Sequence, residues 1–287
     1  MHLKRTGDGQ TARICHEDTV PYVSFPLLEE HKDFLHGFST RLGGVSTEHL
    51  SSMNLSFTRG DDPERVRENY RRIAGSIGFR PEDMVLSAQT HTTHVRKVTE
   101  ADRGMGFTRP LEYADVDGLM TNVPGIVLVG SFADCVPLYF IDPVEKVAAL
   151  SHSGWKGTAH RMGRVTVEAM EREYGCRPEN LYAVIGPSIC RECYEVSEDV
   201  LMQIEAIIPE EQASKMYEKK ENGRYQLDLW KVNEQILLDA GIPKEHIAVT
   251  DVCTCCNPEI FFSHRASRGQ RGNMAAFLGI RRPEDSF

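Results

Sequence analysis

Four short apolar runs, each followed by a turn, constrain the fold of this 287-residue chain more than any other feature. Runs of this length that end in turns of Gly, Pro, Cys or His are typical of buried strands. Helical patterns occur between such runs, so the sequence predicts an α/β fold. The predicted strands are residues 125–132, 147–152, 181–185 and 247–252. Reactive side chains gather in the turns that follow them, where open α/β sheets usually carry their binding sites.

Three helices and one further strand are predicted from local signals. Asp62 and Pro63 favour a helix start, and Gly78 favours its end near residue 77. Thr158 is the predicted cap of a second helix, and a third helix ends just before Gly241. The predicted helices are residues 62–77, 159–174 and 228–239, and an alternating segment at 84–98 is predicted to be one long strand.

The charge balance and the lack of long apolar segments narrow the class of protein. The 33 basic and 42 acidic side chains give a net charge of −9 and a pI near 5.7, which argues against a nucleic-acid-binding protein. No apolar stretch reaches the length of about 18 residues that predicts a membrane span. The polar first ten residues lack a signal-peptide core, so we expect a cytoplasmic chain with eight reduced cysteines. Without linkers or repeats, we expect one domain over residues 1–287.

Three side chains in separate segments form a candidate catalytic metal site. His91 lies in the alternating segment, Cys135 follows the first predicted strand, and His152 ends the second. One thiolate and two imidazoles suit Zn²⁺, and three protein ligands leave a fourth position open for catalysis. Each residue taken alone is more often structural, since a cysteine at a strand end commonly packs as a small apolar side chain.

The alternation of a strand favours His91 over His94 as the ligand. In an unbroken strand the two side chains point to opposite faces of the sheet, so both cannot serve one site. Gln89 shares a face with His91 and could fix its ring by a hydrogen bond.

Several residues are candidates for binding phosphate or the rest of a substrate. The turn at 154–158 precedes a predicted helix, and glycine-rich turns in this position can hold an anion on backbone N–H groups. Equally, its glycines could only allow a strand and a helix to pack closely. Arginine is suited to bidentate recognition of phosphate, although most loop arginines are simply solvated. The candidates are Arg41, Asn54, Arg59, Gly154, Lys156 and Arg265.

Two Cys-x-x-Cys pairs, Cys190 with Cys193 and Cys253 with Cys256, raise the alternative of a structural zinc site. However, 59 residues separate the pairs, whereas a compact zinc ribbon separates them by roughly 15–20. A chain of this length also has no need of a metal to stabilise its core. We therefore expect reduced thiols near the strand ends, with Cys253 lining the floor of the site; the role of Cys255 stays open.

Ordered motifs along nearly the whole chain resemble the laccase-domain, or polyphenol-oxidase-like, family, whose members are also described as purine nucleoside phosphorylases. The resemblance runs from about residue 37 to residue 280 and is close to bacterial members of the family. Two departures stand out: Thr92 replaces the usual glycine after Gln-x-His, and Asn273 replaces the usual arginine after a glycine, although Arg271 could substitute. The matching motifs are GFSTRLGGVS, MNLS, QTH, DGLMT, ADCVPL, HSGWKGT, IGPSI, CYEV and FFSHR.

This resemblance implies a zinc-dependent enzyme whose metal ligands fall on His91, Cys135 and His152. It also implies a four-layer α/β/β/α sandwich of mixed sheets and helices, usually monomeric. The implied substrates are purine nucleosides (adenosine, inosine and methylthioadenosine) and phosphate, with possible adenosine deamination. The acid that protonates the departing base is left open among Asp134, His264 and Lys156.

Two other functions compete with this one. Cys135 with His152 or His91 as its base could form a metal-independent cysteine hydrolase. A copper-dependent phenol oxidase is the other, and Cu²⁺ could occupy the same N/S ligands. The 11 histidines include no His-x-His pair, too few for the blue-copper site and trinuclear cluster of a multicopper oxidase. The signature of zinc-dependent deaminases is also absent.

Overall fold

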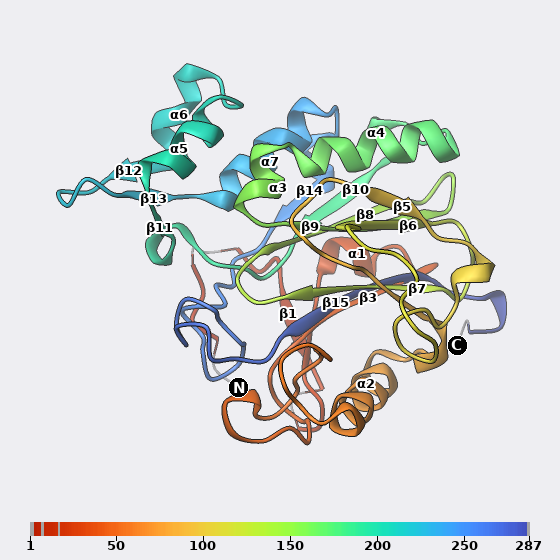
Figure 1. Ribbon diagram of the computed structural model, residues 1–287. Coiled ribbons are helices and arrows are strands. Elements are labelled where there is room, and N and C mark those ends of the chain that lie inside the picture. The colour runs from red at the N-terminus through yellow and green to blue at the C-terminus, as the bar shows by residue number, and fades with distance from the viewer. Residues whose placement is uncertain (1–2, 7–8, 17, 286–287) are drawn as a thin grey trace.

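Two six-stranded mixed sheets, packed face to face, form the centre of the computed structural model, which describes residues 3–6, 9–16 and 18–285 (Figure 1). In the first sheet every neighbouring pair is antiparallel except β4 and β7. Its order is β1 (Arg13–Cys15), β2 (Tyr22–Ser24), β3 (Phe34–Ser39), β15 (Met274–Ile280), β7 (Val127–Phe132) and β4 (Met84–Leu86).

The second sheet combines antiparallel pairs with one parallel pair at each edge. Its order is β14 (Ile247–Val249), β10 (Tyr182–Ile185), β8 (Val136–Asp142), β9 (Val147–Ser153), β6 (Gly118–Thr121) and β5 (Val95–Lys97). A small third sheet has the order β11 (Glu195–Val196), β13 (Tyr225–Leu227) and β12 (Tyr217–Lys219).

Helices cover the outer faces of the two large sheets. In Figure 1, α4 and α7 lie over the second sheet, α2 lies under the first, and α5 and α6 lie beside the small third sheet. The helices are α1 (Pro26–Glu29), α2 (Pro63–Ile77), α3 (Trp155–Ala159), α4 (Met162–Tyr174), α5 (Glu198–Glu205), α6 (Glu210–Met216) and α7 (Leu229–Asp239). The predicted mixed α/β fold is confirmed. No helix in the described ranges is both long and apolar enough to cross a membrane.

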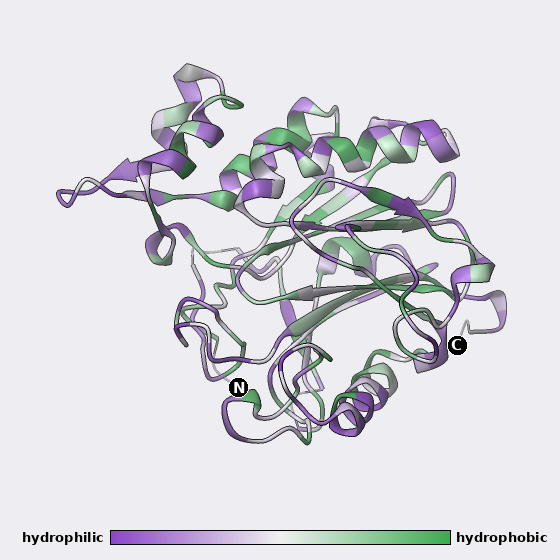
Figure 2. Cartoon of the chain, in the orientation of Figure 1, coloured by the Kyte–Doolittle hydropathy of each residue, from purple (hydrophilic) through white to green (hydrophobic). Residues whose placement is uncertain are grey.

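The apolar side chains explain this arrangement. Phe38 and Leu128 of the first sheet pack in one cluster with Tyr139 and Leu150 of the second, so the space between the sheets is the main core. Figure 2 shows the same division, with hydrophobic strands inside and hydrophilic outer sides on the helices. Burial of this apolar area is the principal force that holds the two sheets together.

Two of the predicted helices are confirmed almost to the residue. The side chain of Asp62 accepts a hydrogen bond from the Glu64 N–H at the start of α2, and Gly78 ends the helix with a φ of 93°. Asp228 caps α7 in the same way, accepting from the Lys231 N–H. Such caps are local, which is why the sequence indicates them well.

Two predictions about segments near the site are wrong. Residues 84–98 are not one strand: β4 belongs to the first sheet, β5 to the second, and residues 87–94 form the loop between them. The helix predicted at 159–174 is interrupted, because α3 ends at residue 159 and Arg161, with a φ of 54°, precedes α4. Thr158 is a buried residue of α3 whose hydroxyl contacts Ser153, and it does not cap a helix.

Candidate metal centre

His91, Cys135 and His152 come together from three parts of the fold. His91 lies in the loop between β4 and β5, Cys135 in the turn by which the chain passes from β7 to β8, and His152 in β9. One nitrogen or sulfur atom of each lies within 4.8 Å of the others, and the two imidazole ring centres are 5.0 Å apart. The structure thus brings the three predicted ligands together in a geometry that a single metal ion could occupy.

A residue that the sequence did not single out, Asp117, orients two of the three. Its carboxylate accepts hydrogen bonds from the His152 ring at Nδ1 (2.7 Å) and from the His91 N–H (3.1 Å). It also accepts from the N–H groups of Thr90 and Thr92, both at 2.9 Å. His91 adopts a φ of 67°, so its loop turns three successive N–H groups toward one carboxylate. Asp117 is the first residue of the DGLMT motif, so this motif is the sequence feature from which its role could have been inferred.

Asp117 therefore fixes the protonation of the site. Burial opposes its ionisation, but the hydrogen bonds from His152 and from the two threonine N–H groups prevail and lower the pKa of Asp117 to about 2. An ionised carboxylate can only accept, so Nδ1 of His152 carries a proton and Nε2 is the nitrogen left for a metal.

The same pairing favours the thiolate of Cys135. Burial alone would raise the pKa of this thiol, but the neighbouring His152 and His91 rings outweigh it and lower the pKa to about 6. Burial likewise opposes the charge on His152, and the Cys135 and Asp117 anions raise the pKa of its ring to about 9. A thiolate is the form of cysteine that binds metals, so Cys135 is ready for one, whereas His152 has to release its Nε2 proton when a metal binds.

Gly154, at the start of α3, leaves the room that this cluster needs. A Cβ atom at this position would lie 3.0 Å from Cys135 Sγ and 3.3 Å from Cδ2 of His91. A side chain at this position would crowd Cys135 and His91. This close approach accounts for the glycine between strand and helix.

A cavity of about 800 Å³ opens beside the three residues, all of which line it. Its volume is in the range of small-molecule sites. One part of the wall is aromatic, with Tyr70, Phe107 and Tyr113, and another part is polar. The polar part includes Ser131, Asp115, Asn273, Arg59, Arg67, Arg109 and Arg271.

Of the six residues predicted to bind phosphate or substrate, only Arg59 lines this cavity. Arg41 donates to the carbonyls of Ser51 and Pro258, and Asn54 is buried and bonds to Asp61 and Ser56. These two side chains hold loops together and lie outside the cavity wall.

The remaining three lie close to the site but outside the cavity wall. Gly154 touches the metal-ligand cluster, Lys156 is exposed near the Trp155 ring, and Arg265 donates to the carbonyls of Cys193 and Glu195. The turn at 154–158 was predicted to hold an anion at the start of a helix. Helix α3 has only five residues, so its dipole would attract an anion only weakly.

The structure also corrects the reason given for choosing His91. The residue lies in a turn, so strand alternation does not apply to it. Gln89 bonds to the backbone of Ser131 and not to the His91 ring. His94 is turned away, with Nδ1 3.2 Å from the carbonyl of Asp115. The choice between the two histidines depends on contacts with Asp117 that are distant in the sequence.

None of the three candidate acids lines the cavity. Asp134 is buried, and its carboxylate accepts from Thr254 Oγ1, Ser263 Oγ and the Arg265 N–H. His264 is exposed, with Nδ1 3.4 Å from Arg271. Asp134 thus braces the turn that carries Cys135 and has no free position from which to donate a proton.

Arg271 and Asn273 are two of the polar cavity residues that the phosphate prediction did not include. Arg271 bonds to the side-chain oxygen of Asn273, whose amide donates to Ser131 Oγ at 2.6 Å. Burial and the nearby Arg59 lower the pKa of the Arg271 guanidinium to about 10. Both positions 271 and 273 face the cavity. Arg271 could therefore serve in place of the arginine that the family pattern has at position 273.

Cys253 does not line the cavity and is fully buried, contrary to the sequence-based expectation. It instead lies with Cys190, Cys193 and Cys256 in a second cluster of possible metal ligands, which the long separation in sequence argued against.

Comparison with known proteins identifies the family of this chain. The family model described as "Multi-copper polyphenol oxidoreductase laccase" matches residues 35–281. The chain is 38% identical over 258 residues to a Bacillus subtilis protein named purine nucleoside phosphorylase YlmD, covering 88% of this chain and 91% of that one. It is 35% identical over 266 residues to purine nucleoside phosphorylase LACC1 of Mus musculus, covering 90% of this chain and 58% of the mouse protein.

Solved structures agree with both the fold and the family. The crystal structure of the Bacillus licheniformis hypothetical protein YfiH superimposes with a TM-score of 0.87 at 36% identity, covering 93% of this chain and 99% of that one. YlmD from Geobacillus stearothermophilus gives a TM-score of 0.87 at 35% identity, covering 94% and 99%. The chain therefore belongs to the laccase-like family described as multi-copper polyphenol oxidoreductases, which includes relatives named purine nucleoside phosphorylases.

Proposed function

We propose that this protein is a purine nucleoside phosphorylase in which His91, Cys135 and His152 hold a zinc ion. The names of its relatives support the reaction class. The observation that carries the proposal is the convergence of one thiol and two imidazoles on a cavity that also presents the guanidinium groups of Arg59 and Arg271.

The donor set fits zinc well. A thiolate and two neutral imidazoles are ligands that Zn²⁺ prefers; Asp117 holds Nδ1 of His152, so Nε2 would bind the metal once it has released its proton. When bound by three protein ligands, zinc supplies Lewis-acid chemistry at its open coordination position. Copper is less well supported. Among the described residues, one of the two clusters that could hold a metal contains two histidines and the other contains none. The copper sites of a multicopper oxidase need many more histidines than these.

Arg59 and Arg271 are suited to bind the phosphate dianion. Arg271 is only 8% exposed, and its Nε has no hydrogen-bond partner within the described part of the chain. A buried, unpaired N–H of a charged group is costly unless a ligand accepts from it. Two guanidinium groups at one wall would therefore hold phosphate by charge-assisted hydrogen bonds and keep its oxygens oriented for attack.

The rest of the cavity fits a nucleoside. The rings of Phe107 and Tyr113 supply an apolar wall against which a purine can stack. In phosphorolysis a phosphate oxygen bonds to C1′ of the ribose while the bond from C1′ to the purine nitrogen breaks, and the base leaves with that electron pair and takes up a proton. The phosphate held by the arginines stabilises the positive charge that develops on the sugar.

One specific observation favours a second candidate. The lowered pKa of Cys135 beside His152 is also the arrangement of a cysteine hydrolase. In that case Cys135 would attack the substrate and no metal would be needed. The two candidates use the same residues and differ in their response to metal removal.

Incubation of zinc-loaded protein with adenosine, with and without phosphate, tests the proposal. We expect adenine and ribose 1-phosphate only when phosphate is present, loss of turnover after chelation, and recovery when zinc is restored. Inosine formed without phosphate would identify deamination instead. Turnover that survives chelation but not thiol alkylation would support the hydrolase, and no phosphate-dependent release of adenine, inosine or methylthioadenosine products would overturn the phosphorylase.

A further inference from the structure

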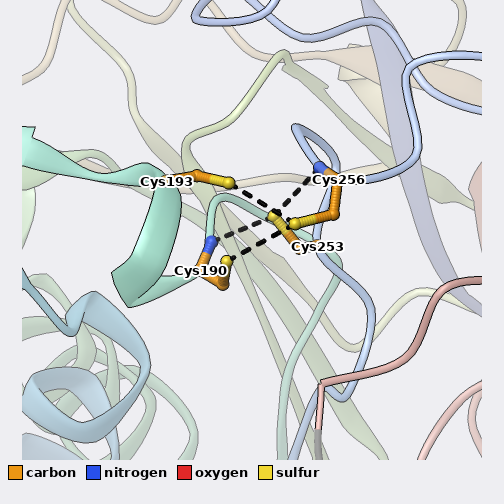
Figure 3. A group of neighbouring side chains, drawn as sticks. All are labelled: Cys190, Cys193, Cys253 and Cys256. Carbon is orange, nitrogen blue, oxygen red and sulfur yellow. Dashed lines mark hydrogen bonds between the residues drawn. The ribbon is translucent and has the colours of Figure 1, made fainter.

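We propose that Cys190, Cys193, Cys253 and Cys256 bind a second, structural zinc ion through four thiolates. Figure 3 shows the four side chains pointing toward one another from two loops. All four sulfur atoms lie within 4.8 Å of one another. This cluster is separate from the candidate metal centre and does not depend on the proposed function.

The topology of the second sheet explains how pairs so far apart in the sequence meet. Strands β10 and β14 are parallel neighbours, with Ile185 opposite Val249. Parallel neighbours end at the same edge of a sheet, so the segments that follow them start side by side. Cys190 and Cys193 follow β10, and Cys253 and Cys256 follow β14. The 59 intervening residues form other elements and place no strain on the site.

The sulfur positions approach those of a tetrahedral zinc site. With Zn–S bonds of about 2.3 Å, a regular tetrahedron places neighbouring sulfurs roughly 3.8 Å apart. The Cys190 and Cys256 sulfurs are 3.9 Å apart, and those of Cys193 and Cys256 are 3.4 Å apart. A disulfide needs a separation of about 2.05 Å, and both pairs are well beyond it.

Two backbone N–H groups hold the sulfur of Cys253 in the cluster. The N–H groups of Cys190 and Cys256 both point at the sulfur of Cys253, at 3.2 and 3.4 Å. Cys253 is fully buried, so these two bonds fix the position of its sulfur within the cluster.

A set of four protein ligands leaves no open position, so the role of this ion is structural. It would join the segment after β10 to the segment after β14. The second segment includes Thr254, whose hydroxyl donates to Asp134 at 2.7 Å, and Asp134 is the residue before Cys135. The first includes the Cys193 carbonyl, which accepts from Arg265. The second ion thus fixes the loops that support the catalytic turn.

Metal analysis of the full chain tests this proposal. We expect two zinc ions per chain in the wild-type protein and one in Cys135→Ala, in which the catalytic site is disabled. Cys193→Ser and Cys256→Ser should each lose one zinc. Cys255→Ser is the matched control, because this cysteine lies between two proposed ligands and should leave both ions in place.

The coordination of the remaining ion in Cys135→Ala decides the question even where Cys193→Ser or Cys256→Ser fails to fold. X-ray absorption at the zinc edge should give four sulfur neighbours at about 2.3 Å. A Cys135→Ala protein without zinc, one with nitrogen or oxygen neighbours, one that holds iron, or a mass two hydrogens lower from a disulfide would overturn the proposal. Failure of nucleoside phosphorolysis would leave it intact.

Discussion

The carboxylate of Asp117 lies 2.7 Å from Nδ1 of His152 and also accepts the backbone N–H of His91. One buried side chain therefore positions two of the three candidate metal ligands, which come from a loop and a strand. Carboxylates that hold a metal-binding histidine in this way fix the tautomer of the ring and strengthen its bond to the metal. Asp117 is a positioning residue, and its replacement should show this.

Asp117→Asn should weaken zinc binding at the catalytic site about 10–100-fold. The asparagine amide is neutral and has only one oxygen. It therefore cannot accept hydrogen bonds both from the His152 ring and from the N–H groups of the loop, as the two carboxylate oxygens of Asp117 do. The zinc dissociation constant of a Cys256→Ser background, which isolates this site, can be measured by competition with a chromophoric chelator. Asp142→Asn is the matched control, because Asp142 is equally buried but accepts N–H groups of a distant turn. Equal zinc affinities for the two variants would contradict the role assigned to Asp117.

Arg271→Met should raise the KM for phosphate about tenfold or more, since a hydrogen bond to a charged group contributes roughly 1.5–3 kcal/mol. Arg59→Met should act in the same direction. Steady-state kinetics with phosphate varied at saturating nucleoside measure the effect. Lys156→Met is the control: Lys156 is exposed and outside the cavity, so its loss should leave this KM unchanged. If Lys156→Met raised the KM and Arg271→Met did not, the phosphate would lie at the turn of 154–158.

Gly154→Ala should weaken binding of the catalytic metal while the protein stays folded. The new methyl group would lie 3.0 Å from Cys135 Sγ, tighter than most side-chain contacts, so the sulfur would have to shift from its position in the cluster. Zinc content and circular dichroism, measured together, separate loss of the site from loss of the fold. Gly75→Ala is the comparison, because nothing lies near a Cβ there and helix α2 should gain about 0.5–1 kcal/mol. Full zinc occupancy in Gly154→Ala would show that the ligands can shift to make room.

Stability should fall as the pH decreases from about 6.5 to about 4. Burial lowers the pKa of His36 from 6.5 to about 4, and its Nε2 accepts the Phe25 N–H at 3.0 Å. The unfolded chain takes up a proton on His36 in this range and the folded chain does not. Stability is therefore fully present above pH 6.5 and decreases by up to about 1.4 kcal/mol per pH unit below it.

Urea unfolding at several pH values measures this slope. A His36→Leu variant should have a shallower slope over the same range, because the group responsible is missing. Burial also lowers the pKa of His31, so this histidine adds to the loss of stability at low pH in the same direction. His31→Leu is therefore the variant with which the slope of His36→Leu is compared. Identical slopes for wild-type protein and His36→Leu would show that other groups govern the acid sensitivity.

The sequence indicated the elements whose signals are local. Helices α2 and α7 carry their own caps, and β7, β9 and β10 are apolar enough to be recognised alone. Strand β15 was not predicted, because Ala275, Ala276 and Gly279 have little intrinsic preference for strands. Pairing with β3 and β7 on both sides makes it a central strand nevertheless.

The residues of the candidate site also fall into those that the sequence indicated and those that it did not. His91, Cys135 and His152 are chemically distinctive, so residue type and the family resemblance pointed to them. Asp117 acts through contacts with residues 25 or more positions away, and Arg271 acts through the cavity that it faces. Spacing in the sequence alone can show neither. Conversely, the sequence favoured Arg41 as an anion-binding residue, because its hydrogen bonds to the carbonyls of Ser51 and Pro258 depend on the folded structure.

The position of β15 has a consequence for biosynthesis. Its partners β3 and β7 emerge from the ribosome long before residues 274–280. Until then, the two strands have no central neighbour and each presents an unpaired edge to solvent, which invites aggregation. A nascent chain of this protein must therefore wait for residues 274–280 before the sheet can close, and chains that stop short of them should be strong clients for molecular chaperones.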